Sequence, residues 1–144
     1  MDNLISQIRN ELKKHLDYTD SRRGTVTAVY LFGSRAAPGH RGETSDLDLA
    51  FLLDSKVYGA DPVTAVSPAY IAASNLGVAL GLETDVTILN AASLEMAYEI
   101  ITTGRCLLDN DPDKRMDYEI ALRGMYFDFK PFLERLRAGC ASRL

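Results

Sequence analysis

The sequence predicts an α/β protein, or α+β under a stricter name, in which a small mixed sheet is backed by helices. Short segments rich in β-branched and aromatic residues alternate with longer segments whose apolar residues recur at helical spacing. At 144 residues and 47% hydrophobic, the chain can bury a core but has no room for two full domains. We expect one compact unit, with a domain at residues 1–110 and a helical extension at residues 111–144 packed on it.

The first two elements follow from their apolar periodicity. Ile5, Ile8, Leu12 and Leu16 recur at helical spacing, which predicts an amphipathic helix. Residues 25–32 (TVTAVYLF) are rich in β-branched and aromatic side chains and stop at a glycine. This pattern predicts a buried strand with an abrupt end.

A loop and a second strand come next. Residues 35–45 contain a proline and two glycines and are predicted to form the loop. Residues 46–53 (DLDLAFLL) predict a strand, because five of the last six are apolar and the run is short for a helix. Its acidic start is unusual for a buried strand. Residues 54–66 show no readable pattern.

The next helix is indicated by its end signals. Ser67 is a good capping residue and stands before Pro68, a residue type favoured at the first helical position. We expect this helix to run to about Leu80 and to be closed by Gly81.

The last third of the chain is mostly helical. Residues 84–89 (TDVTIL) predict a third strand, and residues 93–104 predict a helix that ends at a glycine. Residues 106–108 are short enough to form an edge strand. From residue 111 a long helical pattern continues to Leu136, with a bend expected near Pro131.

Composition excludes several classes of protein. A net charge of −4 argues against direct binding of nucleic acid, and Cys106 and Cys140 are too far apart for a zinc motif. The amphipathic N-terminus is unlike a secretory signal, and no apolar run approaches the roughly 20 residues that span a bilayer. We therefore expect a cytoplasmic protein without a membrane partner.

Two acids at the start of the second strand indicate metal chemistry. Side chains alternate across a strand, so Asp46 and Asp48 are expected on the same face. Their repulsion would be relieved by a hard divalent cation such as Mg²⁺. The alternative is that both acids are solvated in the preceding turn and their spacing is accidental.

Two further features lie near this pair in the expected sheet. Gly33 and Ser34 follow the first strand, where a glycine lets backbone N–H groups approach a phosphate closely and a serine adds a hydroxyl donor. Asp85 lies inside the third strand, where a buried carboxylate needs a partner or a metal. Gly33-Ser34 could instead be an ordinary turn, and Asp85 could be exposed on an edge.

The segments FGSRA, TSDLDLAFLL and TDVTIL together resemble the motifs of the DNA polymerase β-type nucleotidyltransferase superfamily. Within it the chain is similar to the minimal nucleotidyltransferases, and GRCLLDNDPDKRMDYEIALRGMYFDFKPFLERL resembles the helical tail of those that serve as antitoxins in MNT/HEPN toxin–antitoxin pairs. The resemblance implies a polymerase β-like fold, with residues 1–110 as the nucleotidyltransferase domain. The connection AAPGHRG departs from the small-basic-glycine pattern that is usual in the family.

The resemblance also implies roles for single residues. Gly33 and Ser34 would hold the triphosphate of ATP, and Asp46 and Asp48 would bind two Mg²⁺ ions. Asp85 would bind the second metal and help to deprotonate the acceptor.

The loop also contains basic residues that could contact phosphate. Arg35 and Arg41 flank the expected phosphate site and could neutralise the leaving pyrophosphate, and we include Arg35 among the nucleotide-binding residues. Loop arginines are more often solvated, and His40 is expected to be simply exposed.

The leading hypothesis, drawn from the resemblance, is an antitoxin that transfers AMP from ATP to a tyrosine of a cognate HEPN toxin ribonuclease. One alternative is a nucleotidyltransferase that modifies a small hydroxylated molecule such as an aminoglycoside. Another is a non-catalytic antitoxin that neutralises its toxin by binding. About half of the last helix's aromatic cluster, residues 126–132, is expected in the core and half on a surface that docks the toxin.

Overall fold

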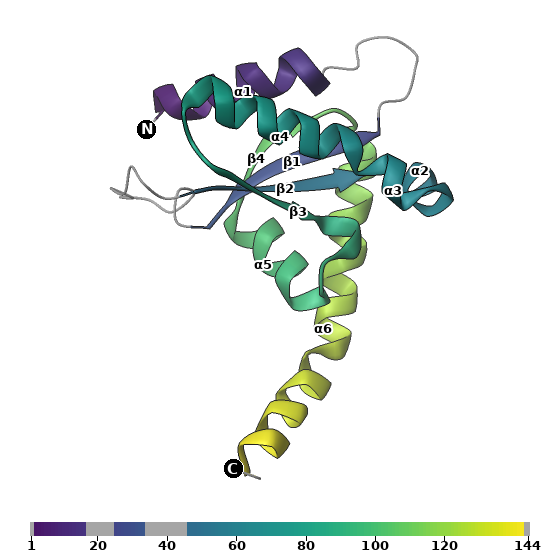
Figure 1. The fold of residues 1–144 in the computed structure, drawn as a ribbon. Helices are drawn as coiled ribbons and strands as arrows, with labels where there is room; N and C mark the ends of the chain where they lie inside the picture. Colours follow the sequence, from purple (N-terminus) through teal and green to yellow (C-terminus); the bar gives the residue numbers. More distant parts are fainter. Residues whose placement is uncertain (1, 17–24, 34–45, 143–144) are drawn as a thin grey trace.

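The fold is an α/β sandwich of one sheet between two helical layers (Figure 1). The protein is described by a computed structural model, which covers residues 2–16, 25–33 and 46–142. The elements in chain order are α1 (Asp2–Leu16), β1 (Val26–Phe32), β2 (Leu47–Leu53), α2 (Ser55–Ala60), α3 (Pro62–Ala65), α4 (Ser67–Leu80), β3 (Thr84–Ile88), the 3-10 turn η2 (Leu89–Ala91), α5 (Leu94–Thr103), β4 (Arg105–Asp109) and α6 (Pro112–Ser142).

The strands form a mixed sheet in the order β3-β2-β1-β4. β1 pairs antiparallel with both β2 and β4, whereas β2 and β3 are parallel. The connection from β2 to β3 passes through α2, α3 and α4, as a parallel pair requires a crossover. The predicted class, a small mixed sheet backed by helices, is thereby confirmed, and the expected segment 106–108 is part of the edge strand β4.

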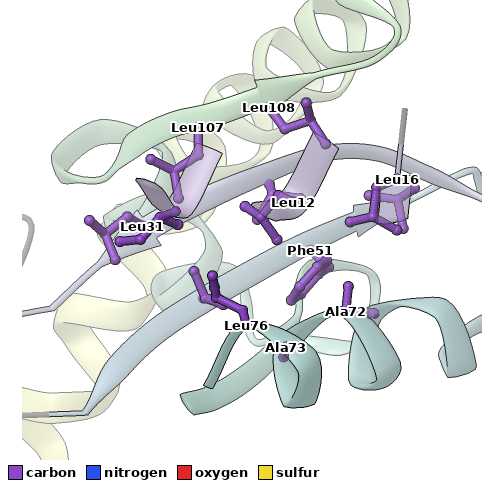
Figure 2. Packing of buried hydrophobic residues seen from close by; sticks show 14 of the residues in the cluster. Leu12, Leu16, Leu31, Phe51, Ala72, Ala73, Leu76, Leu107 and Leu108 are labelled. Carbon is purple, nitrogen blue, oxygen red and sulfur yellow. The ribbon is translucent and has the colours of Figure 1, made fainter. Parts of the chain in front are cut away.

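One face of the sheet is covered by α1 and α4 (Figure 1). Figure 2 shows Leu12 and Leu16 of α1 in the same apolar core as Phe51 of β2 and Leu76 of α4. All four side chains are fully buried, or within 1% of it. This larger core explains why every second residue of β2 is apolar.

The other face packs against α5 and the first half of α6. Tyr30 of β1 donates a hydrogen bond of 2.6 Å to Glu119 Oε2 of α6. Burial and the nearby Glu119 carboxylate raise the pKa of Tyr30 far above its ordinary value, so this phenol stays protonated. Arg115 then bridges Glu119 and Asp109 of β4, which ties α6 to two strands.

The region that showed no pattern, residues 54–66, forms the two short helices α2 and α3. Each begins at an aspartate that accepts a backbone hydrogen bond, Asp54 from Val57 N and Asp61 from Thr64 N. The prediction that Ser67 caps α4 was wrong. The chain enters α4 directly from α3 through Val66, whose backbone is already helical, so no side-chain cap is needed.

The segment Pro62–Leu80 is long and apolar enough, by length and composition alone, to cross a membrane. This corrects the expectation that no apolar run approaches that length, because small uncharged residues fill the segment between its larger apolar ones. The segment is nevertheless two helices joined at Val66, and one face of α4 is buried in the core. The buried side chains of α4 are Ala69, Ala72, Ala73 and Leu76.

Helix α6 starts at Pro112 and remains helical through Pro131. Its C-terminal half projects beyond the sheet (Figure 1). The apolar pattern predicted this helix but not its buried face, because the side chains that pack on the sheet are Leu122 and, in part, Tyr118.

Candidate active site

Two aspartates of the predicted set are direct neighbours in the sheet. Asp48 is the second residue of β2, and it pairs with Asp85 of β3 in the parallel register. Residues of β2 with even numbers, such as Ala50, belong to the face covered by α5 and α6, so Asp48 lies on that side of the sheet. Asp46 immediately precedes β2 and is exposed. The structure therefore brings all three acids to one end of the sheet.

The end of β1 closes this corner from the other side. Phe32 pairs with Asp48, and Gly33 follows with a positive φ of 77°. A Cβ placed on Gly33 would overlap Asp48 Oδ2. A glycine is needed here for two reasons, the left-handed backbone and the carboxylate that lies against its Cα.

The charges of the three acids interact. Burial raises the pKa of Asp48 above its ordinary value, and the negative charges of Asp85 and Asp46 raise it further. Such a group is destabilised in its ionised form until a cation approaches. Carboxylate oxygens are the donors that Mg²⁺ and Ca²⁺ prefer, so the chemistry of this corner fits a hard divalent cation.

The three carboxylates do not converge on one point. Among the residues that the structure describes, no three acidic, histidine or cysteine side chains lie close enough to hold one metal ion together. Asp46 and Asp85 are exposed and have room to turn.

The other candidates for phosphate contacts lie outside the described residues, and they are Ser34, Arg35, His40 and Arg41. The described part of the predicted nucleotide site is thus Gly33 alone.

Comparison with known proteins is decisive for the family. The family model for polymerase beta nucleotidyltransferases matches residues 7–113. The chain belongs to this nucleotidyltransferase family. A search of curated proteins gives no match.

Solved structures show the same fold over nearly the whole nucleotidyltransferase. A chain of a toxin–antitoxin complex with AMP-PNP is 22% identical, with a TM-score of 0.65 and coverage of 92% of this chain and 98% of that one. A chain of the MntA–HepT toxin–antitoxin complex is 18% identical, with a TM-score of 0.62 and coverage of 94% and 98%. A complex of tri-AMPylated Shewanella oneidensis HEPN toxin with MNT antitoxin gives 18% identity, a TM-score of 0.63 and coverage of 95% and 98%.

The nucleotidyltransferase also has a polar corner that the sequence analysis missed, at the opposite end of β2. A cavity of about 360 Å³ lies there, bordered by Asp54, Asn90 and Lys114. Lys114 Nζ lies 2.6 Å from Asp54 Oδ1, and the Asn90 amide both accepts from Leu53 N and donates to Leu53 O, each at 2.9 Å. These side chains hold α6 and η2 to the end of β2. Asp54 at the start of α2 was readable as a cap, whereas nothing in the sequence marked Asn90 or Lys114.

Proposed function

We propose that this nucleotidyltransferase transfers AMP from ATP to a tyrosine hydroxyl of a cognate HEPN toxin ribonuclease and thereby inactivates the toxin. The observation that carries the proposal is the pairing of Asp48 with Asp85, next to a glycine that cannot bear a side chain. Structures of related chains support the choice of nucleotide and acceptor. One is a toxin–antitoxin complex with the ATP analogue AMP-PNP, and another contains an AMPylated HEPN toxin with its MNT antitoxin.

The three aspartates would hold two Mg²⁺ ions, which the donor set allows. Bound there, the ions supply positive charge opposite the attacking and leaving oxygens, both of which become more negative during the displacement. Asp48 of β2 and Asp46, which immediately precedes this strand, would contribute ligands, and Asp85 would contribute its carboxylate from β3. Binding of the cations would reduce the repulsion among the three carboxylates, and this reduction would contribute to the binding free energy of the metal ions.

The transfer exchanges a phosphoanhydride bond at the α-phosphorus of ATP for a phosphoester bond to the tyrosine oxygen. The tyrosine oxygen forms a bond to this phosphorus, and the bond to the oxygen that bridges to the β-phosphorus breaks. Pyrophosphate leaves with the bridging oxygen. The phenolic proton passes to Asp85, whose carboxylate lies beside Asp48 at the edge of the sheet.

The triphosphate would be held where β1 ends. Gly33 has no side chain between its backbone and the site, which would let a phosphate oxygen approach the backbone closely. Ser34 would add a hydroxyl donor, and Arg35 would place a positive charge near the leaving pyrophosphate. We assign the protein to the cytoplasm, the compartment that supplies ATP and the RNA that a toxin ribonuclease cleaves.

A tyrosine suits this site as the acceptor. Its pKa of about 10 makes the phenol much easier to deprotonate than an aliphatic hydroxyl, so a single carboxylate suffices as the base. An acceptor that docks as a folded protein also positions its own tyrosine through the docking contacts. A chain of 144 residues has little room for a separate part that would position the acceptor.

The test is a transfer reaction with the purified full-length chain, the cognate HEPN toxin, ATP and Mg²⁺. We expect the toxin to gain the mass of one or more AMP groups, to lose ribonuclease activity, and to carry the modification on tyrosine. Asp85→Asn should still bind the toxin but leave its mass unchanged, because Asn cannot accept the proton or bind the metal as a carboxylate does.

Two results would replace the proposal. If Asp85→Asn silences the toxin as well as the wild type does and no mass is gained, the chain neutralises by binding alone. If the toxin stays unmodified and active while a hydroxylated small molecule such as an aminoglycoside gains AMP, the acceptor is a small molecule.

A further inference from the structure

One seam of α6 continues from the core into solvent. Five steps of four, three, four, three and four residues connect Tyr118, Leu122, Met125, Phe129, Phe132 and Leu136. The first two side chains pack on the sheet, and Leu122 is only 4% exposed. The same stripe therefore packs on the core at the N-terminal end of α6 and is exposed to solvent at the C-terminal end.

The outer part of the seam is exposed in equal measure along its length. Met125, Phe129, Phe132 and Leu136 are 49%, 52%, 49% and 50% exposed. These residues lie on the half of α6 that projects beyond the sheet (Figure 1). Such a contiguous stripe of large apolar side chains is typical of an interaction site.

Apolar residues spaced alternately three and four positions apart are typical of helices that pack against each other in a left-handed coiled coil. The exposed stripe thus fits a helix rather than a strand or a loop. The sequence alone had suggested this helix as a docking face for the toxin. The charges beside the stripe favour a different occupant.

We propose that the exposed seam of α6 pairs antiparallel with the same seam of a second copy of this chain. The four residues are self-complementary in that orientation. Met125 faces Leu136 of the second copy, and Phe129 faces Phe132 of the second copy, so each copy contributes the same residues to a two-fold interface. The pairing stops naturally at Leu122, because the chain's own core already buries that side chain.

Charges on the flank of the seam agree with this register. Asp128 and Arg135 each precede a core residue, Phe129 and Leu136, and both lie on the same flank of α6. In an antiparallel pair, residues at these positions face each other across the interface. Asp128 then meets Arg135 of the second copy, and the two-fold axis repeats the contact. A parallel pair would give neither charge an opposite partner.

The other flank of the seam is already occupied by α5. Tyr126 stacks on Tyr98 of α5 with ring centroids 3.8 Å apart, and Arg137 forms an ion pair with Glu95 of α5. A second helix can therefore approach only from the flank that carries Asp128 and Arg135. Within the described residues neither of these two side chains forms an ion pair inside the chain.

The first test is the mass of the purified full-length chain in solution, measured by sedimentation velocity over a range of concentrations without toxin or ATP. We expect the mass to rise with concentration from 15.9 kDa towards twice that value. Phe129→Asp should weaken self-association roughly 30-fold or more, because it buries a charge at the centre of the interface. Ile120→Asp is the matched control, since Ile120 is 70% exposed and lies on the opposite side of α6.

Circular dichroism should show the same helix content in both variants, because both side chains are exposed in the single chain. A chain that stays at 15.9 kDa at every concentration would overturn the proposal. So would a dimer that Phe129→Asp leaves intact. If the wild type is monomeric and Phe129→Asp instead loses binding to the HEPN toxin, the toxin is the occupant.

The second test separates antiparallel self-pairing from every other use of the stripe. Asp128→Arg and Arg135→Asp should each weaken the dimer several-fold, because each places like charges opposite one another twice. The double variant restores opposite charges in both contacts and should recover the wild-type association. A double variant as weak as the two single ones would overturn the antiparallel register. Since ATP and toxin are absent, failure here leaves the proposed AMP transfer untouched.

Discussion

Asp48 of β2 lies directly beside Asp85 of β3 in a parallel pair of strands. Two neighbouring carboxylates at one end of an apolar sheet oppose folding, because burial and the negative charge of Asp85 raise the free energy of the ionised form of Asp48. Such an arrangement lowers the stability of the fold, and residues that lower stability are common at functional sites.

Asp48→Asn should abolish AMP transfer and stabilise the fold. The pKa of Asp48 is raised in the folded state, so ionisation above that pKa destabilises the native protein, and a neutral residue removes the effect. We expect an increase in Tm on the order of 1–3 °C at neutral pH without metal. Calorimetry and the toxin-mass assay measure the two effects.

The control is Asp61→Asn, at the start of α3. Hydrogen bonds from Thr64 lower the pKa of Asp61, so its ionised form stabilises the fold above the unfolded pKa, and that stability is lost at acid pH. Asp61→Asn should therefore leave Tm unchanged or lower it slightly, with transfer intact. Transfer near the wild-type rate in Asp48→Asn would remove Asp48 from the site.

Gly33→Ala should reduce transfer at least 10-fold, because the new methyl group would displace the Asp48 carboxylate and disfavour the positive φ. Steady-state kinetics with ATP should show the loss mainly in kcat. Gly124→Ala in α6 is the control, since a Cβ there meets nothing within 4 Å. This second variant should keep full activity and gain about 0.5–1 kcal/mol of stability. Equal activity of the two variants would show that Gly33 is only a turn.

Removal of divalent metal should stop transfer without unfolding the protein. A chelator removes the metal ions but leaves both hydrophobic cores intact, so the protein should stay folded. Tm should decrease only because the bound ions no longer stabilise the folded state. Mg²⁺ should restore transfer, and Ca²⁺ should restore it poorly because its coordination is larger and less strict. Full transfer in excess chelator would contradict the metal assignment.

Lys114→Ala should destabilise the protein by about 1–3 kcal/mol, because it removes the cation 2.6 Å from the buried Asp54 carboxylate. Lys14→Ala is the control, since Lys14 pairs with Glu11 at the surface and such pairs contribute about 0–1 kcal/mol. Urea unfolding of both variants gives the comparison. Equal losses would mean that the Asp54–Lys114 pair does not hold α6 to the sheet.

Local patterns predicted much of this fold. The short apolar run in residues 46–53 and the β-branched run in residues 84–89 located two strands, and Gly81 ended α4 as expected, with a φ of 66°. The same patterns could not show which strands are neighbours. That Asp48 and Asp85 share a register depends on the crossover through α4, which no local signal specifies.

Helix α6 shows where periodicity fails. Its apolar residues predicted a helix, but they occupy more than one face, and only contact with the sheet decides that Leu122 is buried while Phe129 is exposed. The pairs Tyr30–Glu119 and Asp54–Lys114 were equally unreadable, since each joins residues at least sixty positions apart. The assignments of Ser34 and Arg35 and the division of the chain at residue 110 stay predictions.

The crossover between β2 and β3 also sets the order in which the protein can acquire activity while it folds. β1 and β2 are separated by only 14 residues, whereas the connection between β2 and β3 contains three helices, so we expect β3 to join β2 after β1 does. Asp48 is then in place before Asp85, and the pairing of β2 with β3 completes the proposed catalytic pair. A newly made chain would be catalytically silent until β3 pairs with β2, so chain topology contributes to the interval between synthesis and activity.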